Sequence, residues 1–123
     1  FRQLEETHAM ENVIFNELKL RGFNVDVGVI EINSTNEKGN RVRKQLEIDF
    51  VCNKGSRRYY IQSAYAMPDQ VKMEQEQRSL MLTGDAFKKI IITKDSPGPY
   101  YNEDGVLVMN IFDFLLDENM LNY

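Results

Sequence analysis

Two apolar segments joined by a short polar turn constrain the fold more than any other feature of this sequence. They lie in EIDFVCNKGSRRYYIQSAY, positions 47–65, where apolar, β-branched and aromatic residues flank NKGS. Such a pattern predicts a β-hairpin. The first strand carries an acid, Asp49, and the second carries Gln62 and Ala64. An acid in an apolar strand is either an ordinary polar residue on a half-exposed face or part of a site.

The remaining sequence alternates helical and strand patterns. Apolar residues at helical spacing predict a first helix over roughly 3–21, which Gly22 ends. The predicted order of elements is α-β-β-β-α-β-β-α, which favours an α/β fold with a mixed sheet flanked by helices. The other predicted elements are a strand at 23–32, a polar loop at 33–41, strands at 46–52 and 57–65, a helix at 68–82 capped by Asp69, a strand at 87–94, a loop at 95–105, a strand at 106–110 and a helix at 111–117.

Length and composition predict one domain over residues 1–123, because 42% hydrophobic content is enough for a core. The single cysteine, Cys52, excludes an internal disulfide and fits a reducing, cytoplasmic setting. No apolar run is long enough to cross a membrane, and we expect no membrane partner. The net charge of −4 argues against a general nucleic-acid binder, so any basic surface must be local. The chain begins with Phe1, and we expect it to be a piece of a longer polypeptide.

Two glutamates of the first predicted helix lie on its apolar side. Glu17 falls in the middle of the apolar arc and Glu11 near its edge. A carboxylate facing a core is costly unless it is paired, so each is either a structural ion pair or a group aimed at a site on the sheet. The arc is formed by Met10, Val13, Ile14, Leu18 and Leu20.

Arg78 is the corresponding anomaly on the second predicted helix. The same spacing places it between Val71 and Leu82, which predicts a buried face. A buried guanidinium needs a carboxylate or several carbonyls as partners, so we interpret Arg78 as a structural residue.

Asp49 and Gln62 lie in adjacent predicted strands. If Cys52 opposes Arg57 across the turn, Asp49 opposes Tyr60. Asp49 and Gln62 then share one face as diagonal neighbours, roughly 7–8 Å apart. An acid and a second oxygen at that spacing could reach one divalent cation.

The order of elements, with an acid in the second strand and a polar pair in the third, resembles the PD-(D/E)XK nuclease superfamily. The segments MENVIFNELKLRGFNVDVG, EIDFVCNKGSRRYYIQSAY, EQEQRSLML and VLVMNIFDFLL are similar to an uncharacterised, nuclease-like C-terminal domain of a family of predicted prokaryotic AAA-type ATPases. The resemblance covers almost the whole chain. It implies a restriction-endonuclease-like α-β-β-β-α-β core and an N-terminal ATPase module as a partner in the full-length protein.

The resemblance also implies roles for individual residues. Asp49 matches the metal-binding acid, and Gln62 stands where the second acid is expected. Glu11 and Glu17 match helix acids that complete such a site, and Mg²⁺ is the metal an active site would take. Ala64 departs from the pattern, since it replaces the lysine that stabilises developing phosphate charge.

The leading hypothesis is therefore a degenerate nuclease-like accessory domain that acts as an interaction or nucleic-acid-sensing module, inactive when isolated. An active metal-dependent endonuclease is one alternative, and a structural or oligomerisation domain is another. DNA is the expected nucleic acid. The residues expected to contact it are Arg57, Arg58 and Tyr65.

Overall fold

The apolar period of the first twenty residues forms helix α1 (Arg2–Leu20) in the computed structural model, which describes residues 2–123. Its buried stripe is Met10, Ile14 and Leu18, spaced by one turn. Gly22 ends the helix region with a φ of 88°, a conformation that favours glycine. The prediction that Val13 points inward was wrong: 41% of it is exposed, because this narrow stripe leaves Val13 on its flank.

The strands form one mixed sheet, as the sequence predicted, but it has six strands, because the short β5 lies in residues 95–105, which were predicted as a loop. Their order across the sheet is β1-β2-β3-β4-β6-β5. The first three strands form an antiparallel meander, β4 and β6 continue it in parallel, and β5 pairs antiparallel with β6. The strands are β1 (Asn24–Thr35), β2 (Arg41–Lys54), β3 (Arg57–Ala64), β4 (Lys88–Thr93), β5 (Tyr100–Tyr101) and β6 (Leu107–Asn110).

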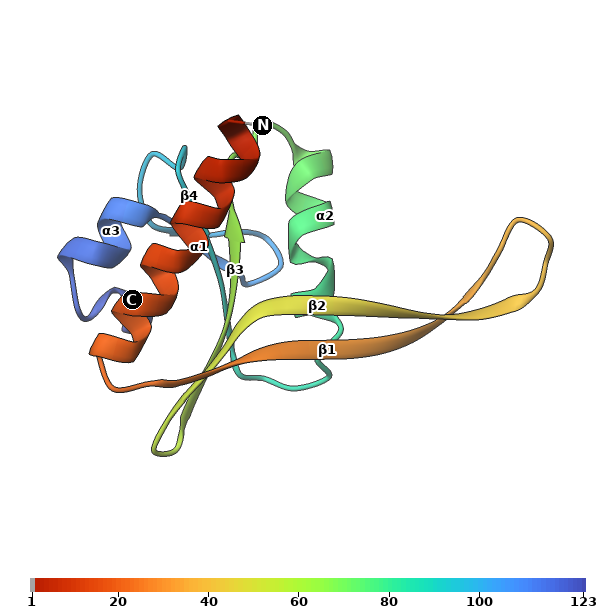
Figure 1. Ribbon diagram of the computed structural model, residues 1–123, viewed down its shortest axis with the longest axis horizontal. Coiled ribbons are helices and arrows are strands. Elements are labelled where there is room, and N and C mark those ends of the chain that lie inside the picture. The colour runs from red at the N-terminus through yellow and green to blue at the C-terminus, as the bar shows by residue number, and fades with distance from the viewer. Residues whose placement is uncertain (1) are drawn as a thin grey trace.

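Helices cover both faces of the sheet (Figure 1). Helix α1 and helix α3 (Ile111–Leu116) pack on one face, and helix α2 (Gln70–Met81) packs on the other. Strand β4 is buried on both sides, since Ile90 and Ile92 join the α1 core while Ile91 joins the α2 core. A short 3-10 helix, η1 (Met120–Asn122), follows α3. No helix within residues 2–123 is long and apolar enough to cross a membrane.

The hairpin of β1 and β2 projects from the body as a long arm (Figure 1). Of residues 33–41, predicted as a loop, residues 36–40 form the turn at its tip, whereas 33–35 and Arg41 are paired strand, because pairing continues to Thr35↔Arg41. Polar side chains occur on both strands there, as in the pairs Glu31↔Gln45 and Asn33↔Arg43. The sequence of this part of the arm therefore lacks the alternation of apolar and polar residues that marks a half-buried strand, although its backbone still pairs.

The buried stripe of α2 differs from the predicted one. Arg78 is exposed, and the apolar residues that defined its predicted face, Val71 and Leu82, are 64% and 44% exposed. The buried polar residue is its neighbour Gln77, which is 5% exposed. The stripe that faces the sheet includes Met73, Gln77 and Leu80. The interpretation of Arg78 as a buried structural residue was therefore wrong by one helical position.

Gln77 connects α2 to the loop before β6. Its Nε2 donates to Asp104 Oδ2 at 2.6 Å, and its Oε1 accepts from Asn102 Nδ2 at 2.8 Å. We expect Gln77→Ala to lower the free energy of unfolding by about 2 kcal/mol, because both hydrogen bonds between the buried Gln77 amide and this loop are lost. Arg78→Ala is the matched control on the same helix and should change it by less than about 0.5 kcal/mol. Urea denaturation of both variants measures the difference. If Arg78→Ala lowered stability more than Gln77→Ala, Arg78 rather than Gln77 would face the sheet.

Candidate functional site

The predicted hairpin has a two-residue turn. Lys54 pairs with Arg57, so that only Gly55, at a φ of 62°, and Ser56 lie between the strands. Pairing continues as far as Phe50↔Ile61. The predicted register, with Cys52 opposite Arg57, was therefore wrong by two residues, because it assumed a four-residue turn.

Beyond Phe50↔Ile61, strand β2 leaves β3 and continues into the arm, which creates a fork in the sheet. The β1–β2 register also shifts here, since Asp26 pairs with Val51 but Gly28 pairs with Ile48. One extra residue in β2 makes this a β-bulge. We call the position of Asp49 and Gln62 between the diverging strands the fork site.

The side chains of Asp49 and Gln62 close this fork. Asp49 Oδ2 accepts from the backbone N–H of Ser63 at 2.8 Å, and the N–H of Asp49 donates to Gln62 Oε1 at 2.7 Å. Gln62 Nε2 donates to the Glu76 carbonyl at 3.3 Å and to Ser79 Oγ at 3.2 Å, both in α2. The two side chains thus replace the hydrogen bonds that β2 and β3 lose when they separate.

The bulge sends the two side chains to different faces. Ile48 packs in the α2 core, while Phe50 packs in the α1 core. Asp49 lines a pocket of about 270 Å³ on the α1 side with Glu11, and the Gln62 amide points into α2. The prediction that Asp49 and Gln62 share one face was therefore wrong, although the two residues do meet at the fork.

Burial raises the pKa of Asp49 to about 6. The hydrogen bond from Ser63 opposes this rise, and the negative charges of Glu11, Glu76 and Glu47 add to it. The carboxyl group consequently holds its proton at a higher pH than an ordinary aspartate. Such a shift, next to a pocket, marks a candidate functional residue.

The other predicted site residues lie in different surroundings. Glu11 lines the Asp49 pocket, whereas Glu17 lies two turns farther along α1 and pairs with Arg21, Oε2 to Nε, at 3.8 Å. Ala64 is 3% exposed and packs in the α2 core. Of the two helix glutamates, only Glu11 lies near the fork site. Ala64 is buried, so a longer side chain at this position would not reach the pocket.

The fork site does not fit a divalent cation. Gln62 Oε1 is neutral and faces the Asp49 N–H, and Ser63 Oγ, buried without a hydrogen-bond partner, adds no charge. Glu11 and Glu47 line the pocket with Asp49, yet within residues 2–123 no three acids, histidines or cysteines lie close enough to hold a metal ion. Mg²⁺ is usually held by one or two carboxylates, with ligands at about 2.0–2.1 Å in an octahedral arrangement, and Asp49 Oδ2 already accepts from the Ser63 N–H.

Arg57, Arg58 and Tyr65 do not form one surface. Arg58 Nε donates to Asn53 Oδ1 at 2.8 Å, and its guanidinium lies 5.5 Å from the Phe87 ring centroid. Tyr65 follows the far end of β3, roughly 26 Å from Arg57 at strand spacing, and donates to Glu6. The predicted nucleic-acid contacts therefore divide between the two ends of the strand.

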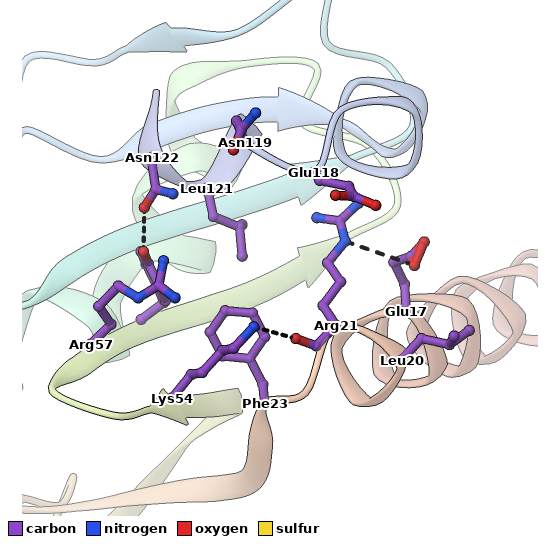
Figure 2. Close-up of a pocket in the computed structure, with 11 residues that line it drawn as sticks. Glu17, Leu20, Arg21, Phe23, Lys54, Arg57, Glu118, Asn119, Leu121 and Asn122 are labelled. Carbon is purple, nitrogen blue, oxygen red and sulfur yellow. Dashed lines mark hydrogen bonds and ion pairs between the residues drawn. The ribbon is translucent and has the colours of Figure 1, made fainter.

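Sequence analysis missed a second pocket, of about 490 Å³, at the Arg57 end of the sheet (Figure 2). It joins the end of α1, the β2–β3 turn and the segment that follows α3, three regions far apart in sequence. No local motif connects them, so periodicity and spacing could not reveal it. Its polar side chains belong to Glu17, Arg21, Lys54, Arg57, Tyr59, Glu118, Asn119 and Asn122.

Comparisons with known proteins leave the family open. No model of a known protein family matches the chain, and no solved structure matches it. An uncharacterised protein of Haemophilus influenzae is 34% identical over 112 residues, which is 89% of this chain. The chain spans only 23% of the length of that relative. It is therefore similar to one part of a much longer protein of unknown function.

Proposed function

We propose that this chain is a nuclease-like accessory domain of a longer protein, an AAA-type ATPase, and that it binds nucleic acid without cutting it. The observation that carries the proposal is the closed fork: Asp49 and Gln62 hold β2, β3 and α2 together through hydrogen bonds. Side chains used in this way support the sheet and are poorly placed to hold a catalytic ion.

The architecture supports the nuclease-like part of the proposal. Helix α1, the antiparallel meander β1–β3, helix α2 and the parallel strand β4 follow one another in the order that the resemblance implies. Asp49 lies where β2 leaves β3. The length of the Haemophilus influenzae relative supports an accessory role, since a longer protein contains a region similar to nearly all of this chain.

Charge and position argue against hydrolysis. The two strands supply one carboxylate, Asp49, and Gln62 contributes no charge. The lysine expected at Ala64 would have to enter the α2 core, where Ala64 is 3% exposed. Removing a positioned donor of this kind costs about 3 kcal/mol of transition-state stabilisation.

An oligomerisation or protein-binding domain is the second candidate. The arm favours it, because Val27 and Val29 on β1 are 63% and 55% exposed. Exposed apolar residues on an edge strand are common in interfaces. A single dimeric species in light scattering, abolished by Val29→Thr, would support this candidate over the first.

We expect the isolated domain to bind DNA but to leave plasmid and single-stranded DNA intact in Mg²⁺ or Mn²⁺. Gel analysis after long incubation checks cleavage, and fluorescence anisotropy checks binding. Asp49→Ala is the control, since cleavage that disappears in this variant would mean that the fork site is catalytic. Cleavage that persists in it would indicate a contaminating nuclease.

A further inference from the structure

The second pocket contains a buried guanidinium with unused donors. The Arg21 side chain is 10% exposed, its Nη2 donates to the Phe114 carbonyl at 2.6 Å, and its guanidinium lies 4.5 Å from the Phe114 ring centroid. Nε and Nη1 are buried without a hydrogen-bond partner. A guanidinium held in one orientation by such contacts, with donors to spare, is suited to an anion.

Two exposed cations from the β2–β3 turn complete the pocket wall (Figure 2). Lys54 Nζ donates to the Arg21 carbonyl at 2.7 Å, which fixes it near the end of α1. The Arg57 side chain makes no hydrogen bond or ion pair with any residue of the described range 2–123. Lys54 and Arg57 therefore place two exposed positive charges in the pocket wall, beside the Arg21 guanidinium.

Two acids also line the pocket. Glu17 is paired with Arg21, but Glu118 is exposed, makes no ion pair within residues 2–123, and points toward the Arg21 end of the pocket (Figure 2). An exposed side chain is displaced at little cost. Glu118 thus occupies the region where an anionic ligand would approach Arg21, and its charge opposes binding.

An aromatic surface adjoins the pocket. Tyr59 donates to Asn122, which lines the pocket, and the next residue, Tyr123, stacks on Tyr101 at 6.4 Å between centroids and 20° between planes. Tyr123 is 60% exposed and Tyr101 48%. Lys88 Nζ lies 5.7 Å from the Tyr101 ring centroid. Exposed rings beside cations are the combination that binds unpaired bases.

We propose that this pocket and the adjoining tyrosines form a binding site for single-stranded nucleic acid, with a backbone phosphate in the pocket at Arg21, Lys54 and Arg57 and a base on Tyr123. The inference rests on the proposed function. It adds where the nucleic acid binds and that the nucleic acid is single-stranded. A duplex keeps its bases stacked on one another, so it can place a phosphate in the pocket but cannot stack a base on Tyr123. Fork residues take no part in this site.

Substitution of the exposed cations tests the phosphate contact. We expect Lys54→Gln and Arg57→Gln each to weaken binding of a labelled oligonucleotide about tenfold in anisotropy and to lower the slope of log affinity against log salt by about 0.7. Lys38→Gln, in the turn at the tip of the arm, removes the same charge elsewhere and should leave both unchanged.

Two further variants, Glu118→Gln and Tyr123→Ala, test the site through changes in affinity that a loss of positive charge elsewhere would not cause. Glu118→Gln should tighten binding several-fold, while Glu37→Gln at the arm tip, with the same charge change, should not. Tyr123→Ala should weaken single-stranded binding at least about fivefold, through lost stacking, and leave duplex binding unchanged. The wild type should prefer the single strand over a duplex of the same sequence.

The outcomes separate this inference from the proposed function. Wild-type binding that is insensitive to Lys54→Gln, Arg57→Gln and Tyr123→Ala would overturn the site and leave a non-cleaving nucleic-acid-binding domain. Equal binding of duplex and single strand would overturn the assigned ligand. Cleavage lost in Asp49→Ala would overturn the proposed function, and the pocket variants would still test the site. Wild-type protein that binds no strand at low salt would overturn both.

Discussion

At pH 8 the Gln62→Glu variant is expected to unfold with a free energy about 3 kcal/mol lower than that of the wild type. Gln62 is 8% exposed and donates from Nε2 to the Glu76 carbonyl and Ser79 Oγ. A carboxylate cannot donate, so an oxygen would face the Glu76 carbonyl oxygen. Its charge would also lie beside Asp49, which already resists ionisation. The acid that the resemblance expects at this position therefore conflicts with the packing found here.

Urea denaturation at pH 8 and pH 5 measures this effect. At the lower pH the introduced carboxyl group takes up a proton and can donate to Glu76, so part of the lost stability should return. Gln75→Glu, at an exposed position of the same helix, makes the same chemical change and should alter stability by less than about 0.5 kcal/mol. Equal stability of Gln62→Glu and wild type would mean that the Gln62 amide does not hold β3 to α2.

Periodicity was enough to predict the buried strands of the sheet and its helices, because burial on one or two faces leaves a strong pattern in the sequence. The run Ile90–Ile92, buried on both sides, marked β4 clearly. Asp69 was correctly predicted as a cap, since its side chain accepts from the Lys72 N–H at 2.9 Å. Helical phase was less secure: Arg78 and Gln77 differ by only one position, and exposed apolar residues at both ends of α2 misplaced the stripe.

The candidate sites depend on features that pattern analysis does not resolve. A two-residue turn and a bulge in β2 together decide where Asp49 points, and neither alters the apolar alternation enough to be predicted. The sequence did bring Asp49 and Gln62 to adjacent strands, which is what creates the fork site. It could not bring Arg21 to Glu118, because that proximity depends on how the segment after α3 returns to the end of α1.

Asp49→Asn is expected to stabilise the protein at pH 8 by about 2 kcal/mol, with little difference near pH 4. The pKa of Asp49 is raised from 3.8 to about 6, chiefly by burial. A raised carboxyl pKa means that the folded state binds the proton more tightly than the unfolded state. The wild type should therefore gain stability from this group as pH falls from about 6 to about 4, and lose it as pH rises. The full shift corresponds to about 3 kcal/mol, reduced here because the side chain is partly exposed.

The amide of Asn keeps the oxygen that accepts from Ser63 and carries no charge, so it imitates the protonated acid at every pH. Asp49→Ala removes that acceptor and should be about 1–2 kcal/mol less stable than Asp49→Asn, because the Ser63 N–H is left unpaired. Asp26→Asn, on the exposed surface of β1, is the matched control for loss of one charge. Thermal and urea unfolding across pH 4–8 would contradict the proposed burial of charge if Asp49→Asn tracked the wild type at every pH. If Asp49→Asn is more stable than the wild type at pH 8, Asp49 lowers the stability of the folded protein. An acid kept at such a cost is the residue that a lost or latent catalytic site would use.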